Sequence, residues 1–188
     1  GLASIPTADV CIVGAGPVGL ALAFRLEELG RTVLVLESGP SLPSQSMTEF
    51  VVGNHAQPAA SMFRGIGGTS ALWGGRCVPF DDLDFEKRRH VPHSGWPIPP
   101  SSLSAYYPDA ARFLQAGDVS SLSGEEGEGE RFTLNALEMW SKRPAIAPLY
   151  EPRLIQSENI TLVTDATVSG VVLGEGRVQA LRMDRRGQ

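Results

Sequence analysis

The sequence predicts an α/β fold in which the first strands lie parallel in one sheet and the last strands form a β-hairpin. The first 40 residues show a strand pattern, a helix pattern and a second strand pattern. A glycine-rich turn at 14–19 joins the first strand to the helix, and three more strand patterns lie within 159–183. Strand, glycine turn, helix and strand within about 30 residues are typical of a right-handed βαβ unit. The chain is therefore expected to have a Rossmann-like, doubly wound fold.

Two short apolar runs supply the strands of this unit. Val10–Val13 is continuous and apolar, which favours a parallel strand buried on both faces. Cys11 lies inside it and is expected to behave as a small hydrophobe. The second run, 32–36, ends directly before Glu37.

The helix between them is expected over 20–29, a segment rich in Ala and Leu. Pro17 suits the first helical turn, where a missing N–H costs little. Gly30 is a typical C-terminal stop.

The middle of the chain is dominated by loops. Residues 38–68 are rich in Ser, Pro, Gly and Gln, and predict a long connection. Prolines recur within 91–108, and Pro108 interrupts a helical pattern at 101–116. The acidic, glycine-rich run 124–130 predicts a solvated or disordered loop.

Three strand patterns follow, at 159–163, 167–173 and 177–183. Gly174, Glu175 and Gly176 separate the last two, which predicts a β-hairpin. The chain stops soon after this hairpin, so we expect it to be interrupted before a substrate domain.

Composition excludes several classes of protein. The net charge of −5 over 188 residues argues against a nucleic-acid partner. Two cysteines form neither a disulfide framework nor a metal site. The sequence shows no secretory signal and no apolar run of roughly 20 residues that would span a bilayer. We therefore expect a soluble, cytoplasmic protein.

The glycine turn has the chemistry of a dinucleotide site. Gly14 allows a sharp turn out of the strand, and Gly16, lacking Cβ, lets a pyrophosphate approach the helix N-terminus. Gly19 allows the helix to pack closely on the sheet. Glu37 can accept hydrogen bonds from ribose hydroxyls, and its charge disfavours a 2′-phosphate. A turn that merely links strand to helix is the alternative, and the unit by itself does not separate FAD from NAD.

A second glycine block follows at 67–75. Gly67 and Gly68 are expected to expose N–H groups to phosphate oxygens, and Thr69 and Ser70 to add hydroxyls and cap a short helix. Gly74 and Gly75 would let the backbone pass close to a flat ring system. Arg64 either neutralises the pyrophosphate or faces solvent, and Trp73 either packs near the ring or belongs to the core.

This block resembles the second flavin-contact segment of the glucose–methanol–choline (GMC) oxidoreductases, most closely their bacterial sugar-dehydrogenase and pyranose-oxidase-like branch. Downstream, 95–98, Leu103 and 106–108 resemble the "GWP…L…YY" segment of that family. Residues 159–162 and 166–168 resemble its strand that returns to the adenine. The resemblance thus covers nearly the whole chain.

The resemblance implies an FAD cofactor. Val168 would contact adenine through its main chain. Some members tether flavin through a His in the second block, where this sequence has Leu72, so we expect non-covalent FAD. The family's catalytic His and its partner lie further toward the C-terminus, and we expect them beyond residue 188.

The resulting candidate site contains no metal ligand and no catalytic residue. His55, His90 and His93 lie in loop-like stretches and are interpreted as surface residues. The expected FAD-binding residues are Gly14, Gly16, Pro17, Gly19, Glu37, Ser38, Arg64, Gly67, Gly68, Thr69, Ser70, Trp73, Gly74, Gly75 and Val168.

Residues 1–80 and 151–188 are expected to form the FAD-binding domain, with 81–150 a loop-and-helix excursion on the substrate side. The resemblance implies oxidation of CH–OH groups of a small-molecule alcohol or sugar by hydride transfer to flavin, with the electron acceptor unassigned. Alternatives are an NAD-linked dehydrogenase and a non-catalytic, truncated flavin-binding module.

Overall fold

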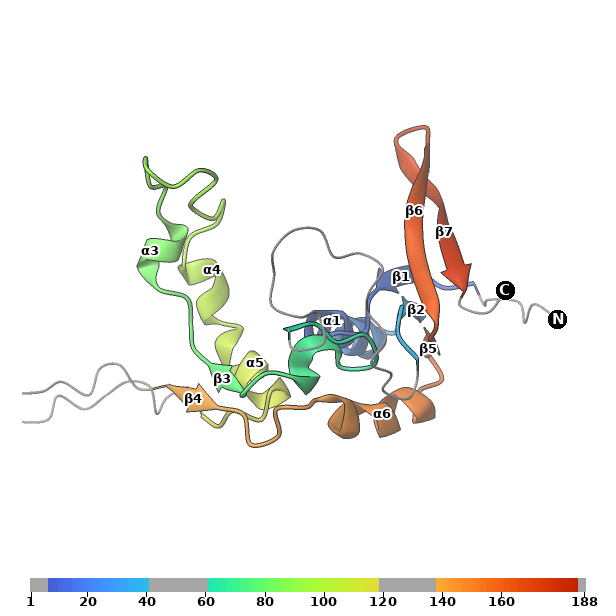
Figure 1. The fold of residues 1–188 in the computed structure, drawn as a ribbon, viewed down its shortest axis with the longest axis horizontal. Coiled ribbons are helices and arrows are strands. Elements are labelled where there is room, and N and C mark those ends of the chain that lie inside the picture. Colours follow the sequence, from blue (N-terminus) through green and yellow to red (C-terminus); the bar gives the residue numbers. More distant parts are fainter. Residues whose placement is uncertain (1–6, 41–60, 119–137, 186–188) are drawn as a thin grey trace, which may run out of the picture. The chain divides into compact units, whose positions relative to one another are not determined.

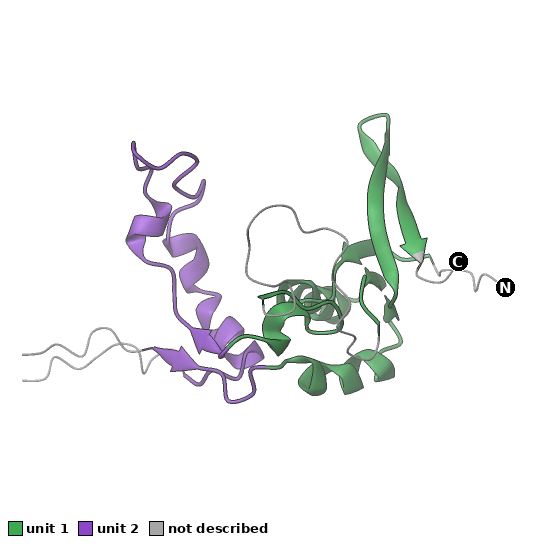
Figure 2. Ribbon diagram, viewed as in Figure 1, with its two compact units in different colours: residues 1–73, 145–188 green, residues 74–144 purple. Residues whose placement is uncertain are grey.

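A computed structural model describes residues 7–40, 61–118 and 138–185. The chain divides into two compact units, one made of 1–73 with 145–188 and the other of 74–144 (Figure 2). Each unit is described by itself below.

The first unit is built on a parallel three-stranded sheet. Its strands are β1 (Val10–Val13), β2 (Val33–Leu36) and β5 (Ile160–Val163), in the order β1-β2-β5. Both pairings are parallel and cover all four residues of each strand. The three strands lie side by side in the order in which they occur in the chain, as in one half of a doubly wound sheet. The predicted α/β class with a parallel sheet is confirmed.

One expectation about β1 is wrong. Ile12 is buried, but Cys11 is exposed and Val13 is 57% exposed, so β1 is buried on one face only. Side chains alternate along a strand, and the face of Ile12 is the one that the helix covers, near Gly19. A short apolar run does not reveal how many layers cover the strand.

Helix α1 (Pro17–Glu28) connects β1 to β2 and begins three residues earlier than predicted. Pro17 is its first residue, and its ring fixes a φ that suits a helix start. Gly30 follows with φ of 71°, a left-handed conformation that ends the helix at little cost. The buried face of α1 carries Leu20, Ala23 and Phe24.

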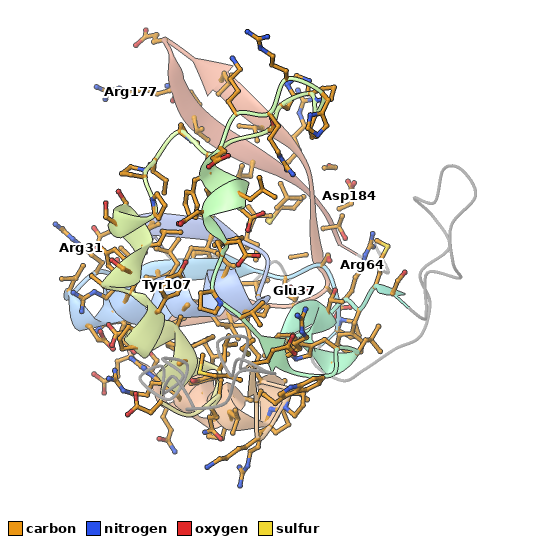
Figure 3. All side chains as sticks on the ribbon, turned by 90° about the vertical axis from the view of Figure 1, so that its left-hand side faces the viewer. Arg31, Glu37, Arg64, Tyr107, Arg177 and Asp184 are labelled. Atoms are coloured by element: carbon orange, nitrogen blue, oxygen red, sulfur yellow. The ribbon has the colours of Figure 1, made fainter. Side chains whose placement is uncertain are left out.

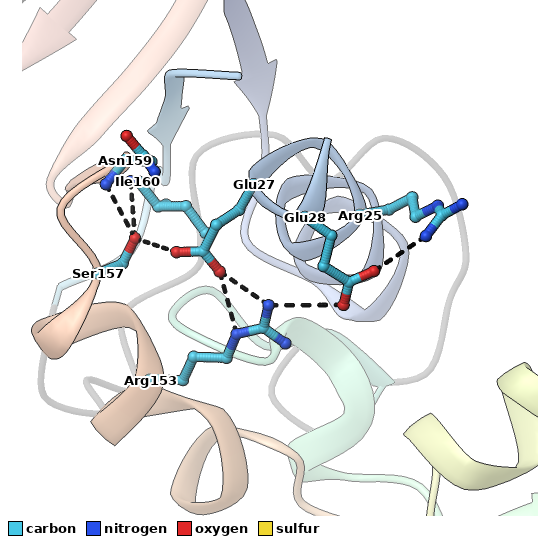
Figure 4. A network of polar contacts seen from close by, with 7 residues as sticks. All are labelled: Arg25, Glu27, Glu28, Arg153, Ser157, Asn159 and Ile160. Carbon is cyan, nitrogen blue, oxygen red and sulfur yellow. Dashed lines mark hydrogen bonds and ion pairs between the residues drawn. The ribbon is translucent and has the colours of Figure 1, made fainter. Parts of the chain in front are cut away.

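Helix α6 (Ala147–Gln156) packs on α1 through an aromatic contact and a network of polar contacts, and Figure 4 shows the polar network. Tyr150 packs on Phe24 with ring centroids 5.3 Å apart, and the Arg153 guanidinium lies 4.1 Å from the centre of the Phe24 ring. Arg153 donates two hydrogen bonds to Glu27, which also accepts one from the Ser157 hydroxyl. These contacts fix the approach to β5, because Ser157 lies three residues before it.

Strands β6 (Ala166–Gly174) and β7 (Arg177–Arg185) form the predicted hairpin, a long twisted ribbon (Figure 1). Its two-residue turn has φ of 51° at Glu175 and 75° at Gly176. Two positive φ angles are characteristic of the type I′ turn, whose twist matches that of the strands.

The second unit is a set of short elements. They are β3 (Arg76–Cys77), α3 (Asp82–Phe85), α4 (Ser101–Ser104), α5 (Tyr107–Phe113) and β4 (Met139–Trp140). Pro108 lies in the first turn of α5, so it starts a helix where the sequence pattern indicated an interruption. Ala111, Ala116 and Met139 form the buried cluster of this unit.

Across the described residues, no helix combines the length and the apolar character needed to cross a bilayer. Residues 41–60 of the predicted connection 38–68, and the whole acidic run 124–130, lie outside the described residues.

Candidate functional site

The turn from β1 into α1 requires glycine at two positions for different reasons. Gly14 has φ of 98° and donates its N–H to the carbonyl of Leu36 at 2.7 Å, which places the turn at the end of β2. A Cβ at Gly14 would meet open space, so the backbone angle alone favours glycine there. A Cβ at Gly19 would lie 2.0 Å from the carbonyl oxygen of Gly14, so close packing requires glycine there.

Neither of the reasons that require glycine at 14 and 19 applies to Gly16. It is the N-cap of α1 with φ of −71°, an angle that any residue adopts, and a Cβ there would have no atom within 4 Å. Within the part of the chain that the structure describes, neither backbone strain nor packing therefore explains a glycine at this position. No side chain of the described residues caps α1, and Pro17 at its first position has no N–H to satisfy. An open approach to an uncapped helix N-terminus fits a phosphate group, which unpaired N–H groups and the helix dipole attract.

Glu37 follows β2 and is buried, with 5% of its surface exposed (Figure 3). Its Oε2 accepts the N–H of Ala15 at 2.8 Å. Its Oε1 accepts the N–H groups of Gly39 at 2.8 Å and Gly65 at 3.1 Å, and the hydroxyl of Ser38 at 3.3 Å. A carboxylate offers about four acceptor positions, two on each oxygen. Oε2, with one donor among the described residues, is thus the oxygen with room for a ribose hydroxyl.

The second glycine block rests directly on the first. The 3-10 helix η1 (Gly68–Ala71) starts after Gly67, whose N–H donates to the carbonyl of Ala15 at 2.8 Å. Gly68 has φ of 52°, and a Cβ there would lie 3.0 Å from the Cα of Gly16. The two blocks, distant in sequence, therefore form one surface at the start of α1.

Two expectations about this block are wrong. The N–H groups of Gly67 and Gly68 are not free for phosphate, since they donate to the carbonyls of Ala15 and Gly65. Ser70 does not cap η1, because it lies inside the helix; its hydroxyl donates to Gly67 O at 2.6 Å and accepts the N–H of Ile146. Ser70 is buried, so its role in this structure is to hold η1 in place.

The remaining predicted residues are placed as follows. Thr69 is exposed on η1, and Arg64 and Trp73 are half-buried. Val168 lies in β6 opposite Met183, with Ala166 before it buried.

Gly74 and Gly75 belong to the second unit. Gly74 is exposed, and a Cβ there would make only an ordinary contact with Trp140. Gly75 has φ of 88°, and a Cβ there would lie 3.0 Å from Pro144 and 3.2 Å from Ser141. Packing inside that unit is thus sufficient to explain Gly75.

Sequence reasoning missed three residues that the structure brings into the site. Ala15, Gly39 and Gly65 each donate an N–H to Glu37. A signal was present for one of them: a glycine two residues after the acidic residue allows the chain to turn back onto its carboxylate. The other two contacts depend on tertiary packing.

The described ranges hold no group of three or more His, Cys, Asp or Glu residues suited to bind a metal. His90 and His93 are exposed, as expected, and His55 lies outside the described residues. The arrangement is suited to hold a nucleotide, with a phosphate at Gly16 and a sugar toward Glu37.

Comparison with known proteins identifies a family. A family model described as DAO, FAD dependent oxidoreductase, matches residues 9–182. No curated protein gives a significant match. The expected FAD cofactor is confirmed by the family match.

Among solved structures, pyridoxine 4-oxidase from Mesorbium loti matches with a TM-score of 0.60 and 21% identity, over 96% of this chain and 47% of that chain. The chain therefore spans about half the length of this neighbour. At this identity the likeness shows a shared fold, and the family itself is shown by the match over residues 9–182.

Two weaker matches support no argument about this chain. The Mycobacterium smegmatis Sdh1 complex in the apo form matches with a TM-score of 0.41 and 12% identity, over 95% of this chain and 31% of that one. L-Amino acid deaminase from Proteus myxofaciens in complex with anthranilate has a TM-score of 0.38 and 13% identity, over 97% and 44% of the two chains.

Proposed function

Because the chain belongs to the FAD-dependent oxidoreductase family, we propose that it supplies the FAD-binding part of an enzyme that oxidises CH–OH groups of an alcohol or sugar. The observation that supports this most is the open, uncapped start of α1 at Gly16, against which the second glycine block packs. A phosphate there would meet main-chain N–H groups and no side chain.

In this proposal the ADP half of FAD lies across the ends of the parallel strands. Gly14, Gly16, Pro17 and Gly19 form the turn that receives the pyrophosphate. Oε2 of Glu37 accepts a ribose hydroxyl beside the N–H of Ala15.

The other contacts rest on the family resemblance. Val168 contacts adenine by its main chain, and Arg64 approaches the pyrophosphate. Ser38, Thr69 and Trp73 complete the lining, and Gly67, Gly68 and Ser70 support it. The unit of residues 1–73 and 145–188 then holds the cofactor.

FAD held by these residues would supply the redox chemistry of hydride transfer, and the protein would bind the substrate, orient it toward the flavin and exclude competing reactions. The general base that removes the hydroxyl proton is not assigned to this chain. Among its described residues, His90 and His93 are exposed loop residues of the second unit.

Two alternatives lead to different observations. An NAD-linked dehydrogenase would use the βαβ unit alone and would exchange nicotinamide nucleotides in a titration. A flavin-binding module without catalysis would bind FAD yet show no alcohol oxidation even when joined to the remainder of a full-length enzyme.

The absorption spectrum of the purified protein, before and after acid precipitation, tests the proposal. We expect flavin bands in the native protein, and free flavin in the supernatant after acid. A colourless protein that binds added NAD and not FAD would contradict FAD binding. Oxidation of sugars and simple alcohols with an artificial electron acceptor then tests the reaction and separates the two substrate classes.

A further inference from the structure

The carboxylate of Glu37 joins three segments that lie far apart in the sequence. It binds the N–H of Ala15 in the first glycine turn, of Gly39 after β2, and of Gly65 before the second glycine block. Residues 15 and 65 are brought together here although β2 and a long connection lie between them. The side chain is 95% buried, so water does not replace these contacts.

Other contacts also join these segments. Ala15 gives its N–H to Glu37 and accepts the N–H of Gly67 on its carbonyl. A Cβ at Gly39 would lie 2.3 Å from the carbonyl carbon of Arg64, so the chain after β2 packs backbone to backbone on the segment before Gly65. The main chain of Glu37 also binds Val163 and Ala166, at the end of β5 and the start of β6.

The geometry points to Glu37 as a positioning residue that assembles the cofactor site, a role separate from any contact with ribose. The inference rests on the proposed function, since the site it assembles is the proposed FAD site. A carboxylate is required because every partner of its two oxygens is a donor. A glutamine would present an NH₂ group to at least one N–H and leave that buried group without an acceptor.

The test uses Glu37→Gln, which keeps the shape of the side chain and changes its hydrogen bonding. Glu28→Gln is the matched control, because Glu28 has a side chain that is 52% exposed and lies on α1 outside the site. Both variants lose one negative charge, so net charge does not distinguish them.

The first measurement is amide hydrogen exchange without added nucleotide. In the wild type we expect the N–H groups of Ala15, Gly39 and Gly65 to be protected. In Glu37→Gln we expect at least the amides that face the new NH₂ group, either Ala15 or the pair Gly39 and Gly65, to exchange about tenfold faster or more. The N–H groups of Gly14 and Glu37, bonded to Leu36 and Val163, should keep their protection. Unprotected Ala15 and Gly65 amides in the wild type would overturn the inference, even if the variant failed to fold.

The second measurement compares ADP with 2′,3′-dideoxy-ADP as ligands. A positioning role predicts that Glu37→Gln weakens the binding of 2′,3′-dideoxy-ADP about tenfold, although this nucleotide has no ribose hydroxyl for Glu37 to bind. A loss confined to ADP would show that Glu37 acts only through the ribose hydroxyls, and would overturn the inference. If the wild type binds neither nucleotide, the proposed function fails, whereas the exchange measurement still decides the role of Glu37.

Discussion

Gly68 lies against Gly16: a methyl group on Gly68 would come within 3.0 Å of the Cα of Gly16. The first glycine belongs to the start of α1 and the second to η1, so the contact joins the two glycine blocks that the sequence shows. Gly16 therefore has backbone on one side and open space in the direction of its missing Cβ. This contact therefore forms one side of the space through which, in our proposal, a phosphate reaches the N-terminus of α1.

Gly68→Ala is expected to lower stability for two reasons that can be separated. The left-handed backbone at φ of 52° costs about 1–2 kcal/mol for a residue with Cβ. The contact with Gly16 adds roughly 1–3 kcal/mol of overpacking. Gly176→Ala is the matched control, since Gly176 has φ of 75° and nothing within 4 Å of a Cβ. Urea unfolding of both variants checks this, and equal losses would contradict the contact.

Gly16→Ala and Gly19→Ala should separate ligand binding from folding. An alanine at 16 finds open space and an ordinary φ, so we expect a stability loss of no more than about 1 kcal/mol, from the weaker N-cap. Its FAD affinity should nevertheless fall about tenfold or more, because the methyl group occupies the phosphate approach. Flavin fluorescence quenching measures this affinity, and an unchanged value would rule out a phosphate at Gly16.

At Gly19 the same substitution should damage the fold. A methyl group 2.0 Å from the carbonyl oxygen of Gly14 forces the backbone of the turn to move. We expect a loss of about 3 kcal/mol or more in the free energy of unfolding, seen as a lower Tm or as insoluble protein. A Gly19→Ala protein as stable as the wild type would contradict this packing of α1 on β1.

The sequence was sufficient to predict the βαβ unit and the hairpin because both depend on local signals. Glycine spacing, Pro17 and the turn residues act over a few positions along the chain. The exposed face of β1 was not predictable, since the apolar run at Cys11 is the same whether one or two layers cover it. The wrong expectation for Ser70 has a similar origin: its buried hydroxyl is directed by Ile146, a tertiary neighbour.

Acid should weaken the attachment of α6 to α1. Burial raises the pKa of Glu27, but hydrogen bonds from Ser157 and Arg153 and the charge of Arg153 outweigh it, and the net pKa lies below the ordinary 4.5. A lowered pKa in the folded state stabilises the fold above the unfolded-state value, and this contribution is lost as pH falls through the folded-state value. Part of the Arg153 side chain is exposed, so we expect only about 1 kcal/mol at pH 7.

Glu27→Gln tests this pH dependence. Its loss of stability relative to the wild type should be present at pH 7 and should shrink well below pH 4.5, where the wild-type carboxylate is protonated. Unfolding in urea at several pH values measures the difference. A stability difference that is constant with pH would contradict an ionised Glu27 in the network. Glu86→Gln, at an exposed position of the second unit, controls for net charge.

The turn of the β6–β7 hairpin holds Glu175 in a strained backbone conformation that a substitution can relieve. Glu175 has φ of 51°, a left-handed conformation that costs energy for most residues, and type I′ turns favour Asn before Gly at these positions. Glu175→Asn should therefore stabilise the hairpin by about 0.5–1 kcal/mol, because Asn tolerates this conformation better. Slower amide exchange in β6 and β7 would report it. Glu175→Ala removes the charge and keeps the strain, so an equal gain in that variant would mean that charge, and not turn geometry, limits the hairpin.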